Sequence, residues 1–311
     1  MNTRDLGPYA VLLAMGAGWG LSVPLAKIAV STGHQPLGLI FWQEVVVVTL
    51  LGAICALRRK RLELGQRYWR LYLMIALCGA VLPDIFFYLA AAKLPGGIMA
   101  IVIASVPLFS LPIALALGNE TFAWRRVLGL SFGIVGILLL IGPEASLPER
   151  AMAAFIPIAL MAPLLYATEG NLVAKWGTQG LDPMQVILGA SLLGMVISLP
   201  LAVVTGQWIN PADSFGAPEL ALVASAAIHG LVYAVYVWLV GRAGSVFAAQ
   251  ASYLVTGCGV LWSMLLLHER YAFWVWLALG IMTIGIALVQ PRRHATPLAP
   301  VTRIGENARN S

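Results

Sequence analysis

Long runs of apolar residues, broken at short intervals by Gly, Pro or Asn, set the pattern of this 311-residue chain. A helix needs roughly 20 consecutive apolar residues to cross a bilayer core of about 30 Å. We expect a membrane-spanning helix in each of ten such runs: 9–31, 37–57, 71–92, 95–117, 123–142, 152–175, 183–205, 217–241, 244–267 and 271–290. The predicted fold class is therefore all-α integral membrane, with ten transmembrane helices.

The composition supports the same class. Hydrophobic residues make up 60% of the chain and charged residues 10%, and the mean hydropathy is +0.88. A soluble domain is about half apolar and a quarter charged, so a soluble fold of this length would leave much apolar surface in water. The start of the chain is similar to a signal peptide, but its apolar run continues from Tyr9 to Val30 without a clear cleavage site. We expect it to be the first membrane helix.

Basic residues gather in the predicted connections and the tail, at 58–70, 123–126 and 290–310. Lys and Arg are enriched on the cytoplasmic side of membrane proteins. This rule predicts a multi-pass cell-membrane protein with both termini in the cytoplasm, because that orientation leaves only four of the 19 Lys and Arg residues outside: Lys27, Lys93, Arg150 and Arg270. The same distribution argues that the net charge of +6 does not reflect a nucleic-acid partner.

Two stretches of the chain, 92–140 and 241–289, resemble each other at a shift of 149 residues. A weaker similarity relates 20–27 to 170–175. The matched pairs in the longer stretches are Lys93 with Arg242, Ala100 with Ala249, Glu120 with Glu269 and Gly136 with Gly285.

A repeat of five spans enters the membrane from opposite sides in its two copies, because five is odd. Such inverted-topology repeats are typical of secondary transporters. The predicted organisation is a cytoplasmic N-terminus (1–8), a first five-helix repeat (9–142), an external connection (143–151), a second five-helix repeat (152–290) and a disordered cytoplasmic tail (291–311).

Several motifs over residues 9–290 resemble the drug/metabolite transporter superfamily, EamA type: Trp19–Gly20, the small-residue helix ending in Pro107, Glu120 followed by Gly129, Gly133 and Gly136, and a second copy at Glu269, Gly280 and Gly285. The resemblance implies a secondary transporter that exports small metabolites by alternating access. The overall pattern is most similar to YddG-type amino-acid exporters, and drugs or other metabolites are the alternative substrates. Many members are expected to carry a basic residue in span two, where this chain has Glu44, so substrate rules built on that residue do not apply here.

Ionisable residues inside the predicted spans are candidates for function, because an idle charge is costly in a bilayer. At 1.5 Å per helical residue, Glu44 and Asp84 both lie about 10 Å below the outer surface. Two facing carboxyls would suit proton coupling or capture of an ammonium group. The alternative is that one of them is hydrogen-bonded by its neighbours and only orders a helix. Pro83 permits a kink beside Asp84.

Other candidates are less specific. Glu169 falls in the inner third of span six, as a gate or an interfacial residue, and His229 lies near the midplane, as a proton shuttle or a packing residue. Aromatic candidates are Trp19, Trp42, Tyr88 and Tyr233, the last being the repeat counterpart of Asp84. An aromatic cavity without mid-depth Lys or Arg suits a neutral amino acid and argues against a sugar nucleotide.

Two groups of residues have expected structural roles. Glu120 and Glu269 each follow one span and precede the next, where a carboxylate caps the N-terminus of a helix. Four prolines inside spans are hinge candidates, with static packing as the alternative: Pro24, Pro83, Pro107 and Pro163.

Competing functions lack their signatures. No H-E-x-x-H, paired-Asp or Ser–His motif indicates an enzyme, no Walker A loop indicates ATP use, and no soluble domain supports a sensor or scaffold. The three cysteines, in separate apolar runs, favour packing over a metal or disulfide. We expect no cofactor. The expected partners are a small-molecule substrate, the lipid bilayer and protons as a candidate coupling ion, with the protein a monomer or a homodimer.

Overall fold

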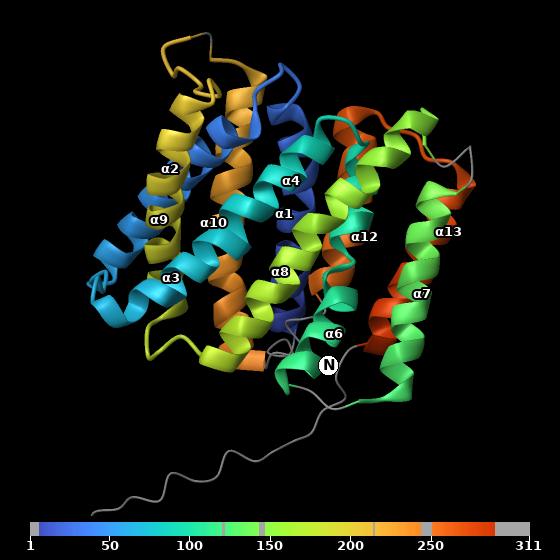
Figure 1. The fold of residues 1–311 in the computed structure, drawn as a ribbon, viewed down its shortest axis with the longest axis horizontal. Coiled ribbons are helices and arrows are strands. Elements are labelled where there is room, and N and C mark those ends of the chain that lie inside the picture. The colour runs from blue at the N-terminus through green and yellow to red at the C-terminus, as the bar shows by residue number, and fades with distance from the viewer. Residues whose placement is uncertain (1–5, 120–121, 143–146, 214, 244–250, 290–311) are drawn as a thin grey trace, which may run out of the picture.

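The computed structural model describes residues 6–119, 122–142, 147–213, 215–243 and 251–289, and all regular secondary structure there is helical (Figure 1). The first half contains α1 (Leu6–Ala29), α2 (Pro36–Leu57), α3 (Trp69–Ile75), α4 (Leu82–Ala91), α5 (Gly96–Ile103), α6 (Val106–Leu117) and α7 (Trp124–Ile141). The second half contains α8 (Ile156–Trp176), α9 (Pro183–Val204), α10 (Ala217–Ala243), α12 (Ala251–Leu267) and α13 (Phe273–Val289). The predicted all-helical membrane fold is confirmed.

Seven helical segments in the described part of the chain are long and apolar enough to cross a membrane. Three more apolar helices are shorter: Ala217–Tyr233, Leu254–Leu267 and Phe273–Gly285. These segments coincide with the predicted spans, although α1 begins three residues earlier than expected. Apolar side chains cover their outer surfaces; Leu138, Val196 and Leu265 are 59%, 57% and 65% exposed, as contact with lipid would require. The count of ten spans and the inverted repeat stay predictions.

The third span is built from four pieces in succession: a 3₁₀ turn η1 (Gln66–Tyr68), α3, a π-helical turn η2 (Ala76–Val81) and α4. Pro83 lies in the first turn of α4. Because proline has no N–H, it cannot donate to the carbonyl of Gly79, one helical turn earlier. The wider π turn sits at this place in the ladder, and π turns inside helices occur frequently at functional sites.

The fourth span is broken between α5 and α6, at Ala104 and Ser105. Ser105 is fully buried and donates from its hydroxyl to the carbonyl of Val102 at 2.6 Å. Pro107 lies in the first turn of α6, so it is found at a real break, as Pro83 is. The other two hinge candidates, Pro24 and Pro163, lie inside the uninterrupted helices α1 and α8.

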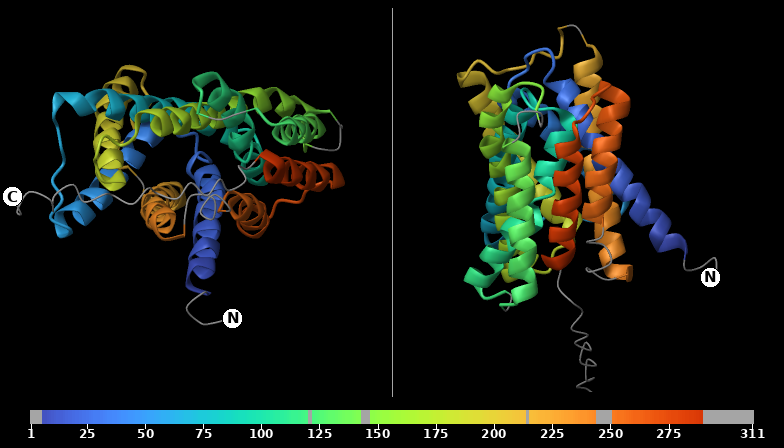
Figure 2. Two further views of the ribbon diagram at one scale, coloured as in Figure 1. Left: turned by 90° about the horizontal axis from the view of Figure 1, so that it is seen from below. Right: turned by 90° about the vertical axis from the view of Figure 1, so that its right-hand side faces the viewer.

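The helices pack in a pattern that relates distant parts of the chain. Helix α1 contacts α10 on one side and α12 on the other, and Figure 2 shows it between them. Helix α8 similarly contacts α4 and α6. Helices α2 and α9 pair at one edge of the molecule, and α7 and α13 pair at the opposite edge (Figure 1). Helices from the two halves therefore meet throughout the bundle.

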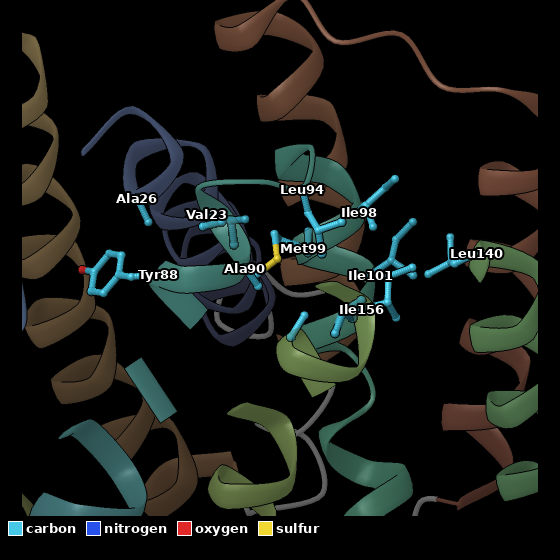
Figure 3. Packing of buried hydrophobic residues seen from close by; sticks show 14 of the residues in the cluster. Val23, Ala26, Tyr88, Ala90, Leu94, Ile98, Met99, Ile101, Leu140 and Ile156 are labelled. Atoms are coloured by element: carbon cyan, nitrogen blue, oxygen red, sulfur yellow. The ribbon is translucent and has the colours of Figure 1, made fainter. Parts of the chain in front are cut away.

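The largest core surrounds α5, whose side chains Ile98, Met99 and Ile101 are fully buried. Figure 3 shows them among Val23 and Ala26 of α1, Ile156 at the start of α8 and Leu140 of α7. Lipid tails are as apolar as these side chains, so van der Waals contact rather than exclusion of water holds such a core together. Helix α5 consequently lies in the largest core, in contact with α1, α4 and α8 of the candidate site.

After the α8–α9 connection, α9 begins with a complete capping box. The Asp182 side chain accepts from the Met184 N–H at 3.0 Å, the Asp182 N–H donates to Gln185, and Pro183 fits the first helical position. Partial burial raises the pKa of Asp182, but the hydrogen bonds from Lys60 and Met184 together lower it by more, so the net pKa lies below its usual value. These contacts explain why α9 starts where it does.

Replacing Gly285 with Ala is expected to destabilise the protein. A Cβ at this position of α13 would lie 2.7 Å from the carbonyl oxygen of Gly129 and 3.0 Å from the nitrogen of Gly133, both on the backbone of α7. The two helices would have to separate, at a cost of about 1–3 kcal/mol. Gly280→Ala is the matched control, because no atom lies within 4 Å of its Cβ position. Thermal melting of purified protein checks this; equal melting temperatures for the two variants would contradict close α7–α13 packing.

Candidate functional site

A buried hydrogen-bond network joins α2, α4 and α8 around Asp84, which is 8% exposed. Its Oδ2 accepts from Gln43 Nε2 at 2.6 Å, and its Oδ1 accepts from the Tyr166 hydroxyl at 2.7 Å. Gln43 Oε1 in turn accepts from the hydroxyl of Tyr88, at 2.5 Å. Asp84 lies in the first turn of α4, directly after the π turn and Pro83, so the irregular stretch of the third span points this carboxyl at α2 and α8.

Glu44, on α2, is more deeply buried than Asp84 and is 2% exposed. Its carboxyl lies against α9, where a Cβ on Gly194 would be 3.3 Å from Glu44 Cδ. Ser191, one helical turn before Gly194, is placed to hydrogen-bond to the carboxyl. Glu44 Oε2 has no hydrogen-bond partner among the described residues. A buried acceptor without a donor is costly, so this oxygen is the least satisfied polar atom of the two carboxyls.

The two carboxyls do not form the facing pair expected from their depth. Asp84 directs both oxygens to neutral donors on α2 and α8, while Glu44 turns to α9. The charge of Asp84 nevertheless acts on Glu44, so the two groups are electrostatic neighbours without sharing a hydrogen bond. They form two adjacent polar positions of different character, one fully bonded and one incompletely bonded.

A cluster of aromatic rings from α1 and α10 forms a second group of candidates. Trp19 has its ring centroid 6.1 Å from His229, 6.5 Å from Tyr233 and 5.7 Å from Tyr236. Trp19 Nε1 is buried and has no hydrogen-bond partner among the described residues. The cluster therefore combines aromatic faces with an unused donor.

Glu169 is a third carboxyl, which packs on the third span. It lies on α8 one turn after Tyr166, and its charge acts on Tyr166 and on Tyr233 of the aromatic cluster. A Cβ on Gly79 would lie 3.0 Å from Glu169 Cδ, so the carboxyl packs directly on the π turn. A side chain at position 79 would require the Glu169 side chain to shift by a few tenths of an ångström. Helix α8 thus contacts the third span on both sides of Pro83: Tyr166 contacts Asp84, which follows Pro83, and Glu169 contacts Gly79, which precedes it.

Trp42 is the candidate that the structure places elsewhere. Its ring packs 5.2 Å from Phe41 and 5.7 Å from Trp208, and its Nε1 donates to the carbonyl of Ile209 at 2.9 Å. These partners belong to the first two turns of α2 and to the α9–α10 connection. Although Trp42 is close to Glu44 in sequence, it faces a connection rather than the polar network.

Glu269 meets a different helix from the one expected. Its Oε1 accepts from the Gly96 N–H at 2.8 Å and its Oε2 from the Gly97 N–H at 3.2 Å, and Tyr271 also donates to it. Gly96 and Gly97 are the first residues of α5, whereas the sequence predicted that Glu269 caps the helix that follows it, α13. A carboxylate at such a terminus is stabilised by the exposed N–H groups. Its repeat counterpart, Glu120, lies outside the described residues.

Three hydrogen-bonding partners of the two carboxyls were not among the candidates: Gln43 and Tyr166 for Asp84, and Ser191 for Glu44. Gln43 carried a usable signal, because it is a polar residue next to Glu44 in an otherwise apolar run. Tyr166 and Ser191 gave none, since their partners lie 82 residues and more away along the chain. Among the described residues, the buried ionisable side chains Glu44 and Asp84 are both acidic, and no cluster is suited to hold a metal ion. The arrangement can accept a proton or an ammonium group.

Comparison with known proteins gives a consistent result over nearly the whole chain. The model of the EamA-like transporter family matches twice, at residues 7–142 and 154–290. The protein described as "Uncharacterized inner membrane transporter YedA" from Escherichia coli (strain K12) is 24% identical over 306 residues, which cover 97% of this chain and 96% of that protein.

Two further similarities cover different shares of the chain. "Protein PecM" from Dickeya dadantii (strain 3937) is 28% identical over 178 residues, 56% of either chain. A solved structure titled only "Crystal structure of protein" superposes with a TM-score of 0.60 and 18% identity, covering 89% of this chain and 97% of the other. At that identity the likeness supports the fold alone.

Proposed function

This chain belongs to the EamA-like transporter family, and on that premise we propose that it is a secondary exporter of small amphipathic metabolites, with neutral and aromatic amino acids as its substrates and alternating access as its mechanism. The observation that carries the substrate class is the network centred on Asp84, with the aromatic cluster of α1 and α10 as a second group. It pairs a buried carboxylate with aromatic faces, and the described residues include no buried Lys or Arg.

Each part of an amino acid has a matching group here. An ammonium group would be drawn to the Asp84 carboxylate, because a hydrogen bond to a charged group is worth about 1.5–3 kcal/mol net. A large apolar or aromatic side chain would stack on Trp19 and Tyr233, as pairs of aromatic rings prefer. Substrates with several phosphates would find no buried cation to bind them.

Alternating access is supported by the two-fold character of the chain. The family model matches each half once, over almost equal lengths. The contacts follow the same relation: α1 packs on α10 and α12, while α8, the corresponding helix of the second half, packs on α4 and α6. Two such halves can exchange packing arrangements so that the site opens to one side at a time. The breaks at Pro83 and Pro107 give helices of the first half places to bend.

Glu44 is the proposed proton carrier. Its buried Oε2 has no donor among the described residues, and binding a proton would remove the cost of an incompletely bonded carboxylate in the membrane. Asp84, with both oxygens bonded, is proposed to bind substrate instead. The relatives' name and the helices support a multi-pass inner-membrane protein; ten spans with both termini in the cytoplasm remain part of the proposal.

The test is uptake of labelled solutes into liposomes holding the purified protein, with and without an acidic lumen. The panel contains Trp, Phe, Met and Leu, and one cationic drug. Flux of the amino acids above that of empty liposomes is the expected result. Flux of the drug alone would replace the substrate class by the alternative one. No flux in the whole panel, from protein shown to be folded by its melting curve, would contradict the proposal.

A further inference from the structure

A cavity of about 420 Å³ lies away from the Asp84 network, at one end of the bundle. It is formed by the last turn of α1 and by the α4–α5, α7–α8 and α12–α13 connections, which lie at the upper end of the molecule in Figure 1. Small-molecule sites in proteins commonly have volumes of about 300–1,000 Å³. The cavity is therefore large enough for a small solute.

Cations are concentrated around this cavity. Lys27, Lys93 and Arg270 line it, and these are three of the four basic residues that the predicted topology leaves outside the cell. Lys27 donates to the carbonyl of Ala91 at 2.7 Å, which fixes its ammonium at the wall and leaves further donors, since an ammonium has three. No hydrogen bond or ion pair is found for the side chains of Lys93 and Arg270 in the described part of the chain.

Glu269, the one carboxylate of the lining, offsets only part of this charge, because it stands against three cations. Both oxygens of Glu269 are taken by the N–H groups of Gly96 and Gly97, with Tyr271 as a further donor. Glu269 keeps its negative charge and acts on Lys27, but it forms no ion pair with a cation of the lining in the described part of the chain, and it caps the start of α5. The remaining wall is apolar and includes Ile98, Leu147 and Met152. The lining consequently combines three cationic side chains with apolar ones.

From this arrangement we propose that the cavity is an external site for an amphipathic anion: a carboxylate or phosphate bound by Lys27, Lys93 and Arg270, with its apolar part against Ile98 and Met152. The chemistry fits the carboxylate of an exported amino acid on the release side, which rests on the proposed function, and equally the headgroup of an anionic lipid. Both sources present the same group to the same cations, and both make affinity fall as ionic strength rises.

The test measures binding rather than transport. Purified protein in nanodiscs of phosphatidylcholine is titrated with N-acetyl-L-phenylalanine and with N-acetyl-L-phenylalaninamide, which differ in the negative charge. We expect the carboxylate to bind more tightly, and Lys93→Gln/Arg270→Gln to weaken its binding about fivefold or more. Arg70→Gln, an exposed cation outside the cavity, is the matched control and should leave the affinity unchanged.

Two comparisons separate the possible sources and the possible failures. Weaker probe binding in nanodiscs that contain phosphatidylglycerol would identify a lipid headgroup as occupant, and equal binding would identify the free solute. Asp84→Asn should keep anion binding even where flux is lost, so a failed transport assay does not decide this site. Equal affinities for acid and amide, or an unchanged affinity in the double variant, would overturn the proposal.

Discussion

Asp84→Asn is expected to lower the initial rate of amino-acid flux by about 10- to 100-fold. The amide removes the negative charge that would hold the ammonium group, a loss of about 1.5–3 kcal/mol. It also introduces an N–H₂ donor opposite two groups that donate already, Gln43 Nε2 and the Tyr166 hydroxyl. The Tyr166 hydroxyl can rotate and accept from this N–H₂ group, while the remaining oxygen still accepts from Gln43, so the variant can keep both contacts and mainly tests the loss of charge. Initial rates of labelled Phe uptake, measured in liposomes with matched protein content, check the prediction.

The control for this variant is Asp182→Asn. Asparagine is as good a helix cap as aspartate, so α9 should still begin at the same place, and Asp182 lies outside the candidate site. Its rate should match that of the unmodified protein. A full rate in Asp84→Asn, with correct melting behaviour, would remove Asp84 from the substrate site.

Glu44→Gln is expected to remove the driving effect of a pH gradient while leaving passive exchange of substrate. One coupled proton contributes about 1.4 kcal/mol per pH unit, equivalent to about tenfold accumulation. Gln cannot carry that proton, but its amide can still meet Ser191 and fit beside Gly194, so the fold should persist. Accumulation of labelled Phe in liposomes with an acidic lumen is the measurement.

Glu63→Gln, in the exposed connection before the third span, is the matched control and should accumulate substrate normally. If Glu44→Gln still accumulates substrate tenfold per pH unit, protons are carried elsewhere. Loss of accumulation together with loss of exchange would instead place Glu44 in substrate binding.

Helix positions could be predicted from the sequence because each span is a local property of about 20 residues. The predicted runs 37–57 and 183–205 differ from α2 and α9 by a single residue at one end. Bends at Pro83 and Pro107 were among the predictions, but their form, a π turn before one and a break of the helix before the other, was not. Both depend on how a proline's missing N–H is accommodated by the surrounding packing, and Pro24 and Pro163 show that the same residue can lie in an uninterrupted helix.

The candidate site could be predicted only in its parts. The free-energy cost of a charged side chain in the bilayer singled out Glu44, Asp84 and Glu169 separately. In the structure Asp84 and Glu169 both lie where α8 meets the third span, and Glu44 lies close enough to Asp84 to be affected by its charge. The partners that distinguish them, Tyr166 for Asp84 and Gly79 for Glu169, come from helices far apart in sequence. Trp42 shows the converse, since nearness in sequence did not place it beside Glu44.

Counterflow of labelled Phe tests the central claim most directly. Liposomes loaded with unlabelled Phe are diluted into a trace of labelled Phe, with no ion gradient. A protein that alternates access to one site exchanges the two pools, so the label should rise transiently above its equilibrium level and then fall. Label that only approaches equilibrium, or never enters although the protein is folded, would contradict alternating-access transport of amino acids by this chain.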